Sequence, residues 1–218
     1  MISEVYNMDC LEYMKTIPDK FFDLCIADPP YGINAAKMHM GIGKKKWTRG
    51  ENWDSKVPED DVFEQMFRVS KHTIIFGGNY FDLPPTRCVI VWDKKIRGMS
   101  FSDGELAWTN FEKPLRIIEI SNSGSQSFHE TKIHPTQKPI ALYSWILDNY
   151  ANGGGKIFDP FLGSGSSRIA AYKKGFDFYA CELNKDYFQA QEERFRKECF
   201  DEITTPNGDI IKQLKLFE

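Results

Sequence analysis

Four consecutive residues, Asp28-Pro29-Pro30-Tyr31, combine groups that could hold a flat ring carrying an amino group. They follow an apolar run over residues 22–27, which predicts a buried strand, and ligands in α/β sheets bind beyond strand ends. Ionised Asp28 and the Pro29 carbonyl are both hydrogen-bond acceptors, and the two prolines stiffen the backbone that carries them. Tyr31 adds an aromatic face. The set suits the exocyclic NH₂ group of adenine or cytosine.

A second set lies near the C-terminal end of the chain, where Gly163-Ser164-Gly165 follows a predicted strand and opens a predicted helix. Glu182 ends the next strand, about 20 residues on, where a carboxylate can accept hydrogen bonds from ribose hydroxyls. The dinucleotide fingerprint would place a third glycine at Arg168. Asp159 would repel a pyrophosphate and suits an ammonium group. S-adenosylmethionine has adenosine, an amino-acid end and no phosphate, so it fits this set.

Each set has a plainer interpretation when it is considered alone. Proline-rich turns often end strands, so residues 28–31 are also consistent with an ordinary turn. A glycine turn over residues 163–165 needs no ligand, and short motifs have a high false-positive rate. The surrounding elements and the remaining motifs therefore decide between the interpretations.

The hydrophobic pattern alternates between strands and helices along the chain. Asp9 is placed to cap the first helix. The pattern predicts one domain over residues 1–218, with a doubly wound, mostly parallel α/β sheet. Residues 105–110 and 115–120 predict an antiparallel pair at its edge. The other predicted strands cover residues 2–7, 23–27, 73–76, 87–92, 156–158 and 176–181, and the helices cover residues 9–17, 58–70, 139–150, 166–174 and 185–199.

The composition describes an ordinary globular protein, with 41% hydrophobic and 27% charged residues and a net charge of −3. No apolar run approaches the ~20 residues of a membrane span, and the N-terminus lacks a signal-peptide pattern, so we expect a cytoplasmic protein without membrane association. The histidines lack metal-ligand spacing, and we expect no metal. The scattered cysteines predict reduced thiols; they are Cys10, Cys25, Cys88, Cys181 and Cys199.

A local basic stretch departs from this acidic average. Residues 32–56 form a long connection after Tyr31, and long loops in compact domains are usually functional or disordered. Because this loop leaves from the mouth of the predicted site, we expect it to contact nucleic acid, although a solvated charged loop is the alternative. The basic residues expected to make this contact are Lys37, Lys44, Lys45, Lys46 and Arg49.

Taken together, these motifs resemble the DNA amino-methyltransferases of the β, or permuted, class, which methylate adenine N6 or cytosine N4. The resemblance covers nearly the whole chain. It rests on residues 28–31, His134-Pro135-Thr136-Gln137-Lys138-Pro139, Phe158-Asp159-Pro160-Phe161-Leu162-Gly163-Ser164-Gly165 and Glu182, in that order. A catalytic motif that precedes the cofactor motif is the mark of this class.

The resemblance implies a seven-stranded type of S-adenosylmethionine-dependent methyltransferase sheet and assigns roles to individual residues. Asp28, Pro29, Pro30 and Tyr31 would be catalytic, with Asp28 also beside the cofactor. Thr136 and Lys138 would help to hold the amino-acid end of the cofactor, and Asp9 would lie near its adenine. The other expected cofactor residues are Asp159, Phe161, Gly163, Ser164, Gly165 and Glu182. His134 is interpreted as part of a rigid approach to a helix.

The expected activity is methylation of adenine N6 in DNA after the base leaves the duplex stack. Aspartate at position 28 favours adenine as a tendency of the family. The alternatives are methylation of cytosine N4 or of an RNA or protein amine, and a non-catalytic nucleic-acid-binding subunit. Residues 111–133 are short for the separate target-recognition segment that these enzymes usually carry. Either residues 32–56 recognise the target, or recognition is minimal, or another subunit supplies it. A homodimer and a restriction or specificity partner remain open.

Overall fold

A computed structural model of the chain describes residues 1–33, 54–98, 102–121, 132–205 and 207–212. These residues form an eight-stranded sheet in the order β1-β8-β7-β2-β3-β5-β4-β6. Its strands are β1 (Ser3–Tyr6), β2 (Phe22–Ala27), β3 (Ser70–Phe76), β4 (Val89–Asp93), β5 (Gly104–Thr109), β6 (Arg116–Glu119), β7 (Lys156–Asp159) and β8 (Asp177–Cys181).

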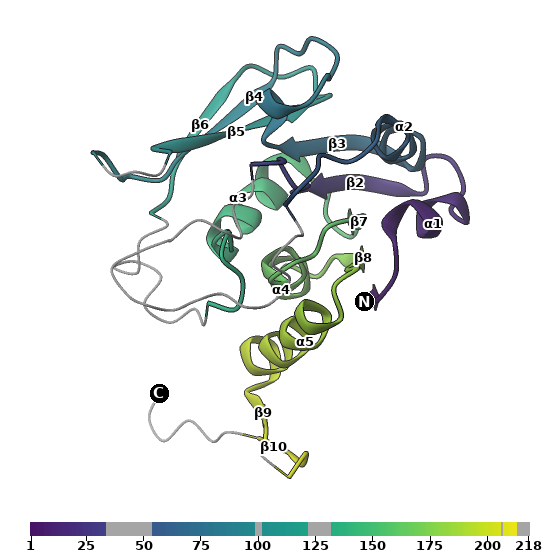
Figure 1. Cartoon of the computed structure of the whole chain (residues 1–218), viewed down its shortest axis with the longest axis vertical. Helices are drawn as coiled ribbons and strands as arrows, with labels where there is room; N and C mark the ends of the chain where they lie inside the picture. The colour runs from purple at the N-terminus through teal and green to yellow at the C-terminus, as the bar shows by residue number, and fades with distance from the viewer. Residues whose placement is uncertain (34–53, 99–101, 122–131, 206, 213–218) are drawn as a thin grey trace.

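Helices cover both faces of the sheet, as Figure 1 shows. Helices α1 (Cys10–Lys15) and α2 (Asp60–Val69) pack on one face, where Met14, Met66 and Phe158 belong to one buried cluster. Helices α3 (Ile140–Tyr150) and α4 (Ser166–Lys173) pack on the other face, where Leu24 and Ile26 of β2 are buried, whereas Cys25 between them belongs to the first cluster. This alternation follows from the two-residue period of a strand. The predicted doubly wound, mostly parallel sheet is confirmed.

Two helix starts were predicted from local chemistry and are close to the observed ones. Asp9 caps α1, because its carboxylate accepts hydrogen bonds from the backbone N–H groups of Leu11 and Glu12 at 2.7 and 3.3 Å. Pro139 has an extended backbone (ψ 144°), so it is the N-cap of α3 and not a residue of its first turn. Helix α1 ends at Lys15 and α2 covers Asp60–Val69, both slightly shorter than predicted.

The predicted antiparallel pair is wrong in its pairing. Strands β5 and β6 do not pair with each other, because β4 lies between them. β5 runs antiparallel to both β3 and β4, whereas β6 runs parallel to β4 at the edge of the sheet. A pair of sequential strands often forms a hairpin, but here the turn at Lys113-Pro114 leads β6 past β5. The start of β5 therefore lies at the same edge of the sheet as the ends of its neighbours β3 and β4.

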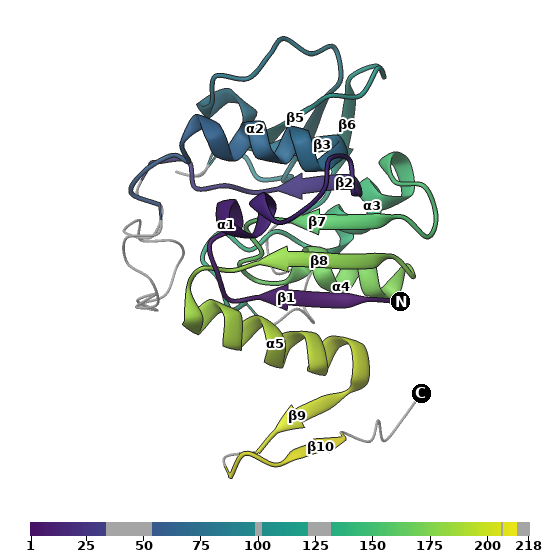
Figure 2. The same cartoon turned by 90° about the vertical axis from the view of Figure 1, so that its right-hand side faces the viewer.

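The chain continues beyond the main sheet into α5 (Lys185–Phe200) and a small hairpin of β9 (Glu202–Thr204) and β10 (Ile210–Lys212). Figure 2 shows this hairpin beyond the far end of α5, away from the strands. Among the described residues, no helix has both the length and the apolar character needed to cross a bilayer. All five cysteines have free thiols, as predicted, and four of them are buried.

Candidate active site

A cavity of about 1190 Å³ opens at the edge of the sheet where the parallel strands end. Residues that directly follow β1, β2, β3, β4, β7 and β8 line it, together with the start of β5. This is the usual place for a ligand in a doubly wound sheet. The cavity thus brings together residues 28–31 and the glycine turn, which are more than a hundred positions apart in the chain.

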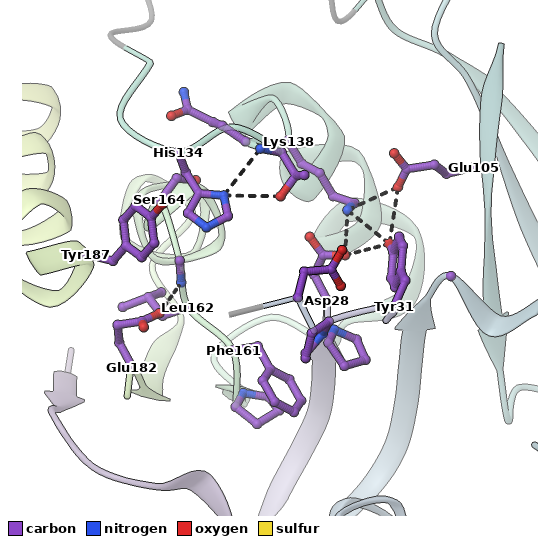
Figure 3. A pocket seen from close by; sticks show the side chains of 18 of the residues that line it. Asp28, Tyr31, Glu105, His134, Lys138, Phe161, Leu162, Ser164, Glu182 and Tyr187 are labelled. Carbon is purple, nitrogen blue, oxygen red and sulfur yellow. Dashed lines mark hydrogen bonds and ion pairs between the residues drawn. The ribbon is translucent and has the colours of Figure 1, made fainter. Parts of the chain in front are cut away.

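Figure 3 shows that the labelled side chains form two groups in this cavity. Asp28, Tyr31, Lys138 and Glu105 form one group, which we call the target half. Glu182, Leu162, Ser164 and Tyr187 lie together on the other side, and we call this group, with the turn that carries it, the cofactor half. Phe161 lies between them.

In the target half, the Asp28 carboxylate is held by two neighbours. Lys138 Nζ lies 2.5 Å from Asp28 Oδ1, and the Tyr31 hydroxyl donates a hydrogen bond of 2.7 Å to the same oxygen. Within the described part of the chain, Asp28 Oδ2 has no such partner. Asp28 can therefore accept a further hydrogen bond through Oδ2 while Oδ1 stays fixed.

Lys138 also contacts Glu105, whose Oε2 lies 3.1 Å from Lys138 Nζ. Glu105 Oε1 lies 2.7 Å from Lys94 Nζ, so two carboxylates alternate with two ammonium groups. Burial would raise the pKa of Glu105, but Lys138 and Lys94 hold it at about 2. For Asp28, burial raises the pKa, Lys138 works against it, and Glu105 adds to the rise. Burial opposes the charged form of Lys138, but Asp28 and Glu105 raise its pKa.

The aromatic part of the target half is built around Tyr31. Its ring stacks on Tyr80, with ring centroids 4.9 Å apart and planes 10° from parallel. Gly77 has a φ of +68°, and a Cβ on it would lie 2.3 Å from the Tyr31 ring, so only glycine allows this packing. Burial and the Asp28 charge raise the pKa of Tyr31, which keeps its hydroxyl protonated as a donor.

In the cofactor half, Glu182 holds the glycine turn through its carboxylate. It accepts hydrogen bonds of 2.8 Å from the backbone N–H groups of both Gly163 and Asn184. Gly163 and Ser164 line the cavity, whereas Gly165 does not. Gly165 has a φ of +75°, and a Cβ on it would lie 3.1 Å from Gln191, so it serves the packing of the turn on α5.

Asp159 lies beneath this turn and is not part of the cavity wall. Its carboxylate is 1% exposed and accepts hydrogen bonds from the Phe161 N–H at 2.9 Å and the Ser167 hydroxyl at 2.5 Å. Burial raises its pKa to about 7, against the opposing effect of these hydrogen bonds. The structure therefore gives Asp159 a role in shaping the turn, and its predicted contact with an ammonium group is untested.

The remaining predicted site residues fall in three places. Asp9, Thr136 and Phe161 line the cavity, as do Pro29 and Pro30. Lys138 lies in the target half on Asp28, and its predicted contact with the cofactor is untested. The five basic residues of the loop, Lys37, Lys44, Lys45, Lys46 and Arg49, lie outside the described residues.

His134 fits the prediction of a rigid approach to α3. Its ring lies against Tyr187, with centroids 4.4 Å apart, and Nδ1 lies 3.1 Å from the Thr136 hydroxyl. Burial and the nearby Lys138 lower its pKa to about 3, so the imidazole is neutral at physiological pH.

Sequence reasoning missed the partners of Asp28. Glu105 begins a predicted strand, and only the antiparallel direction of that strand brings it to the cavity. The adjacent residues Asp93 and Lys94 at the end of β4 have separate partners. Asp93 pairs with Arg97 at 2.6 Å, while Lys94 is buried against Glu105. The signal available in the sequence was a pair of charged residues, Asp93 and Lys94, at the end of a predicted strand.

Comparison with known proteins identifies this architecture. A family model described as DNA methylase matches residues 58–193, more than half of the chain. The chain belongs to this family. The matched range includes Glu105, His134–Lys138 and the cofactor half, while residues 28–31 precede it.

Individual DNA methylases resemble the chain over most of its length. The type II methyltransferase M.BglII of Bacillus subtilis is 21% identical over 266 residues, which cover 97% of this chain and 74% of M.BglII. The M1.HpyAVI–SAM complex has a TM-score of 0.56 and 22% identity, and covers 89% of this chain and 98% of its own. The cytosine-N4-specific PvuII DNA methyltransferase has a TM-score of 0.60 and 16% identity, covering 90% and 86%. The structural matches establish the methyltransferase fold and include a cytosine-N4 enzyme.

Proposed function

We propose that this DNA methylase transfers a methyl group from S-adenosylmethionine to the N6 amino group of adenine in DNA. The observation that carries the proposal is the single cavity that joins a held carboxylate, Asp28, to a Glu182-anchored glycine turn. Its volume of about 1190 Å³ exceeds the ~300–1,000 Å³ of a typical pocket for one small ligand. It therefore has room for a cofactor and a base together.

The lining of the cavity fits a nucleoside ligand without phosphate. Among the described lining residues, Lys94 and Lys138 are the only lysines or arginines, and both pair with carboxylates. Glu182 lines the cavity, and each of its oxygens has a lone pair beyond the one used by the turn. Glu182 would hold ribose hydroxyls, with Phe161 and Asp9 near the adenine and Thr136 near the amino-acid end. When bound, S-adenosylmethionine supplies an electrophilic methyl group.

The residues of the target half would prepare the amine for transfer. Asp28 Oδ2 and the Pro29 carbonyl would accept the two N–H groups and localise the nitrogen lone pair, which adenine otherwise delocalises into its ring. Because the nitrogen becomes more positive as it gains the methyl group, the Asp28 charge stabilises the transition state more than the ground state. Asp28 then accepts the proton that the nitrogen releases. The stacked Tyr31–Tyr80 pair offers a surface for the flipped base.

We further propose that residues 32–56 contact DNA as part of one domain that spans the chain. The two ends of this stretch meet at the cavity, since the Gly32 N–H donates a hydrogen bond of 2.9 Å to buried Asp54. Ile33 and Asp54 both line the cavity. Other basic residues are less available, because Lys95 pairs with Glu119 and Arg97 with Asp93.

The decisive experiment incubates the protein with isotope-labelled S-adenosylmethionine and unmethylated DNA of high sequence complexity. The DNA is then digested, and the labelled nucleoside is identified by mass spectrometry. Labelled N6-methyldeoxyadenosine is the expected product, and an RNA arm tests the alternative polymer. N4-methyldeoxycytidine would support the same mechanism on cytosine, a chemistry that the PvuII methyltransferase performs. Cofactor binding without any labelled nucleoside would instead favour a non-catalytic subunit.

A further inference from the structure

Glu105 reaches the target half because of the direction of its strand. β5 runs antiparallel to β3 and β4, so its first residues lie beside the end of β4. At Gly104, a Cβ would lie 2.6 Å from the Trp92 carbonyl oxygen. The missing side chain therefore lets the start of β5 approach β4 closely, and this places Glu105 beside Lys94.

Both oxygens of Glu105 are already engaged. Oε1 lies 2.7 Å from Lys94 Nζ, and Oε2 lies 3.1 Å from Lys138 Nζ and 3.4 Å from the Tyr31 hydroxyl. Lys138 is 3% exposed, so its ammonium group is shielded from water, whereas the Glu105 side chain is 20% exposed. Glu105 is thus poorly placed to bind the target amine itself and well placed to act on the groups that hold Asp28.

Lys138 and Tyr31 are shared between the two carboxylates. Each of them contacts Oδ1 of Asp28 and Oε2 of Glu105. If Lys138 had Asp28 as its only carboxylate partner, the ammonium would follow Asp28 and compete with the target amine for its oxygens. A second carboxylate on the opposite side draws the ammonium away and fixes its position.

We propose that Glu105 is a positioning residue for methyl transfer: by sharing Lys138 and Tyr31 with Asp28, it fixes Oδ1 and leaves Oδ2 for the amine. This inference rests on the proposed function of Asp28. It assigns Glu105 to orientation of the acceptor, without contact with the reacting atoms.

Replacement of Glu105 by glutamine removes the charge and keeps the shape. We expect kcat to fall by about 10–100-fold, the effect that loss of an orienting partner has in other sites. The KM values for DNA and S-adenosylmethionine should stay close to those of the parent. Glu119→Gln is the matched control, because Glu119 is an exposed carboxylate that pairs with Lys95 outside the cavity. An unchanged kcat in Glu105→Gln would overturn the proposal.

A second measurement does not depend on activity. The titration of Asp28 is followed by ¹³C NMR of its carboxyl carbon in the parent and in Glu105→Gln, without ligands. Since the like charge of Glu105 raises the pKa of Asp28, its removal should lower the midpoint. The other charged or titratable groups around Asp28 and Lys138 are the same in both proteins; they are Tyr31, Lys94, His134, Tyr143 and Asp159.

An unchanged midpoint would contradict the proposal even if the parent methylates adenine. A shifted midpoint in a protein that methylates no nucleic acid would reject the proposed function and retain the role of Glu105 in holding Asp28.

The double variant Glu105→Gln/Lys94→Met addresses stability, because it removes one charge of each sign. We expect it to fold and to keep the low kcat, since Lys138 still lacks its second carboxylate. Full recovery of kcat would show that Glu105 only neutralises the charge of Lys94, and this would overturn its role in positioning Asp28.

Discussion

The two halves of the cavity are built from different interactions. In the cofactor half, backbone N–H groups bond to carboxylates: Gly163 and Asn184 to Glu182, and Phe161 to Asp159. In the target half, side chains from separate elements bond to one another, with Asp28, Lys138, Glu105 and Lys94 in an alternating chain of charges.

The two halves should therefore respond differently to substitution. The cofactor half depends on a local turn whose geometry the glycines and prolines set, so a single side chain removed there weakens one contact or loosens one loop. The target half depends on charges that are buried together, and loss of one partner leaves another charge without compensation. We therefore expect changes in the target half to have the larger effects.

The largest effect is expected from Asp28→Ala. Loss of a charged acceptor at the reacting amine should raise the barrier by about 3 kcal/mol or more, which is roughly a 100-fold loss of kcat. Single-turnover methyl transfer measures this, and calorimetry should show that affinity for S-adenosylmethionine is nearly kept. Turnover close to that of the parent would remove Asp28 from the mechanism.

Glu182→Ala tests the cofactor half in the same way. Loss of charge-assisted hydrogen bonds should weaken binding of S-adenosylmethionine by about 1.5–3 kcal/mol, and the turn at Gly163 loses its anchor as well. Calorimetry measures the affinity. Glu64→Ala serves as the control, because Glu64 is an exposed carboxylate on α2 that does not line the cavity. If both variants bind like the parent, the cofactor lies elsewhere.

A smaller effect is expected where DNA would meet the rim of the cavity. Changing Lys44, Lys45 and Lys46 together to glutamine should reduce DNA affinity and flatten its salt dependence, by about 0.9 in the log–log slope for each lost phosphate contact. Fluorescence anisotropy at several salt concentrations measures both quantities. Binding of S-adenosylmethionine should not change. A salt slope equal to that of the parent would exclude these lysines as phosphate contacts.

The smallest effect concerns stability, through the buried carboxylate of the cofactor half. Because burial raises the pKa of Asp159 to about 7 in the folded protein, folding favours the protonated form. Its contribution is fully present below pH ~4 and is lost as pH rises through 7. The free energy of unfolding of the parent should therefore fall between pH 6 and 7 relative to that of Asp159→Asn, which lacks this titration. The change in the difference between the two proteins should be at most about 1.4 kcal/mol over this interval. Urea unfolding at both pH values measures this, and parallel pH profiles would place the Asp159 pKa outside this range.

Much of the architecture could be predicted because its signals are local. The apolar run before Asp28, the cap at Asp9 and the glycines at 163 and 165 each depend on neighbouring residues, and their elements were found close to the predicted bounds. The pairing of residues 105–110 with 115–120 was wrong because strand order depends on contacts between distant segments. For residues 32–56, the only signals were the basic residues and the position after Tyr31, so the sequence predicts a contact with DNA but no structure for the loop.

Residue types at short spacing set the alternation of strands and helices, the two motifs and their order, so these features follow from the amino-acid sequence alone. Other features depend on the folded chain: Lys138 contacts Asp28, Glu105 and Lys94 complete the charge network, and Tyr80 stacks on Tyr31. These contacts join the ends of separate strands and the approach to α3. Such contacts depend on strand order and direction, and packing across the whole sheet sets both.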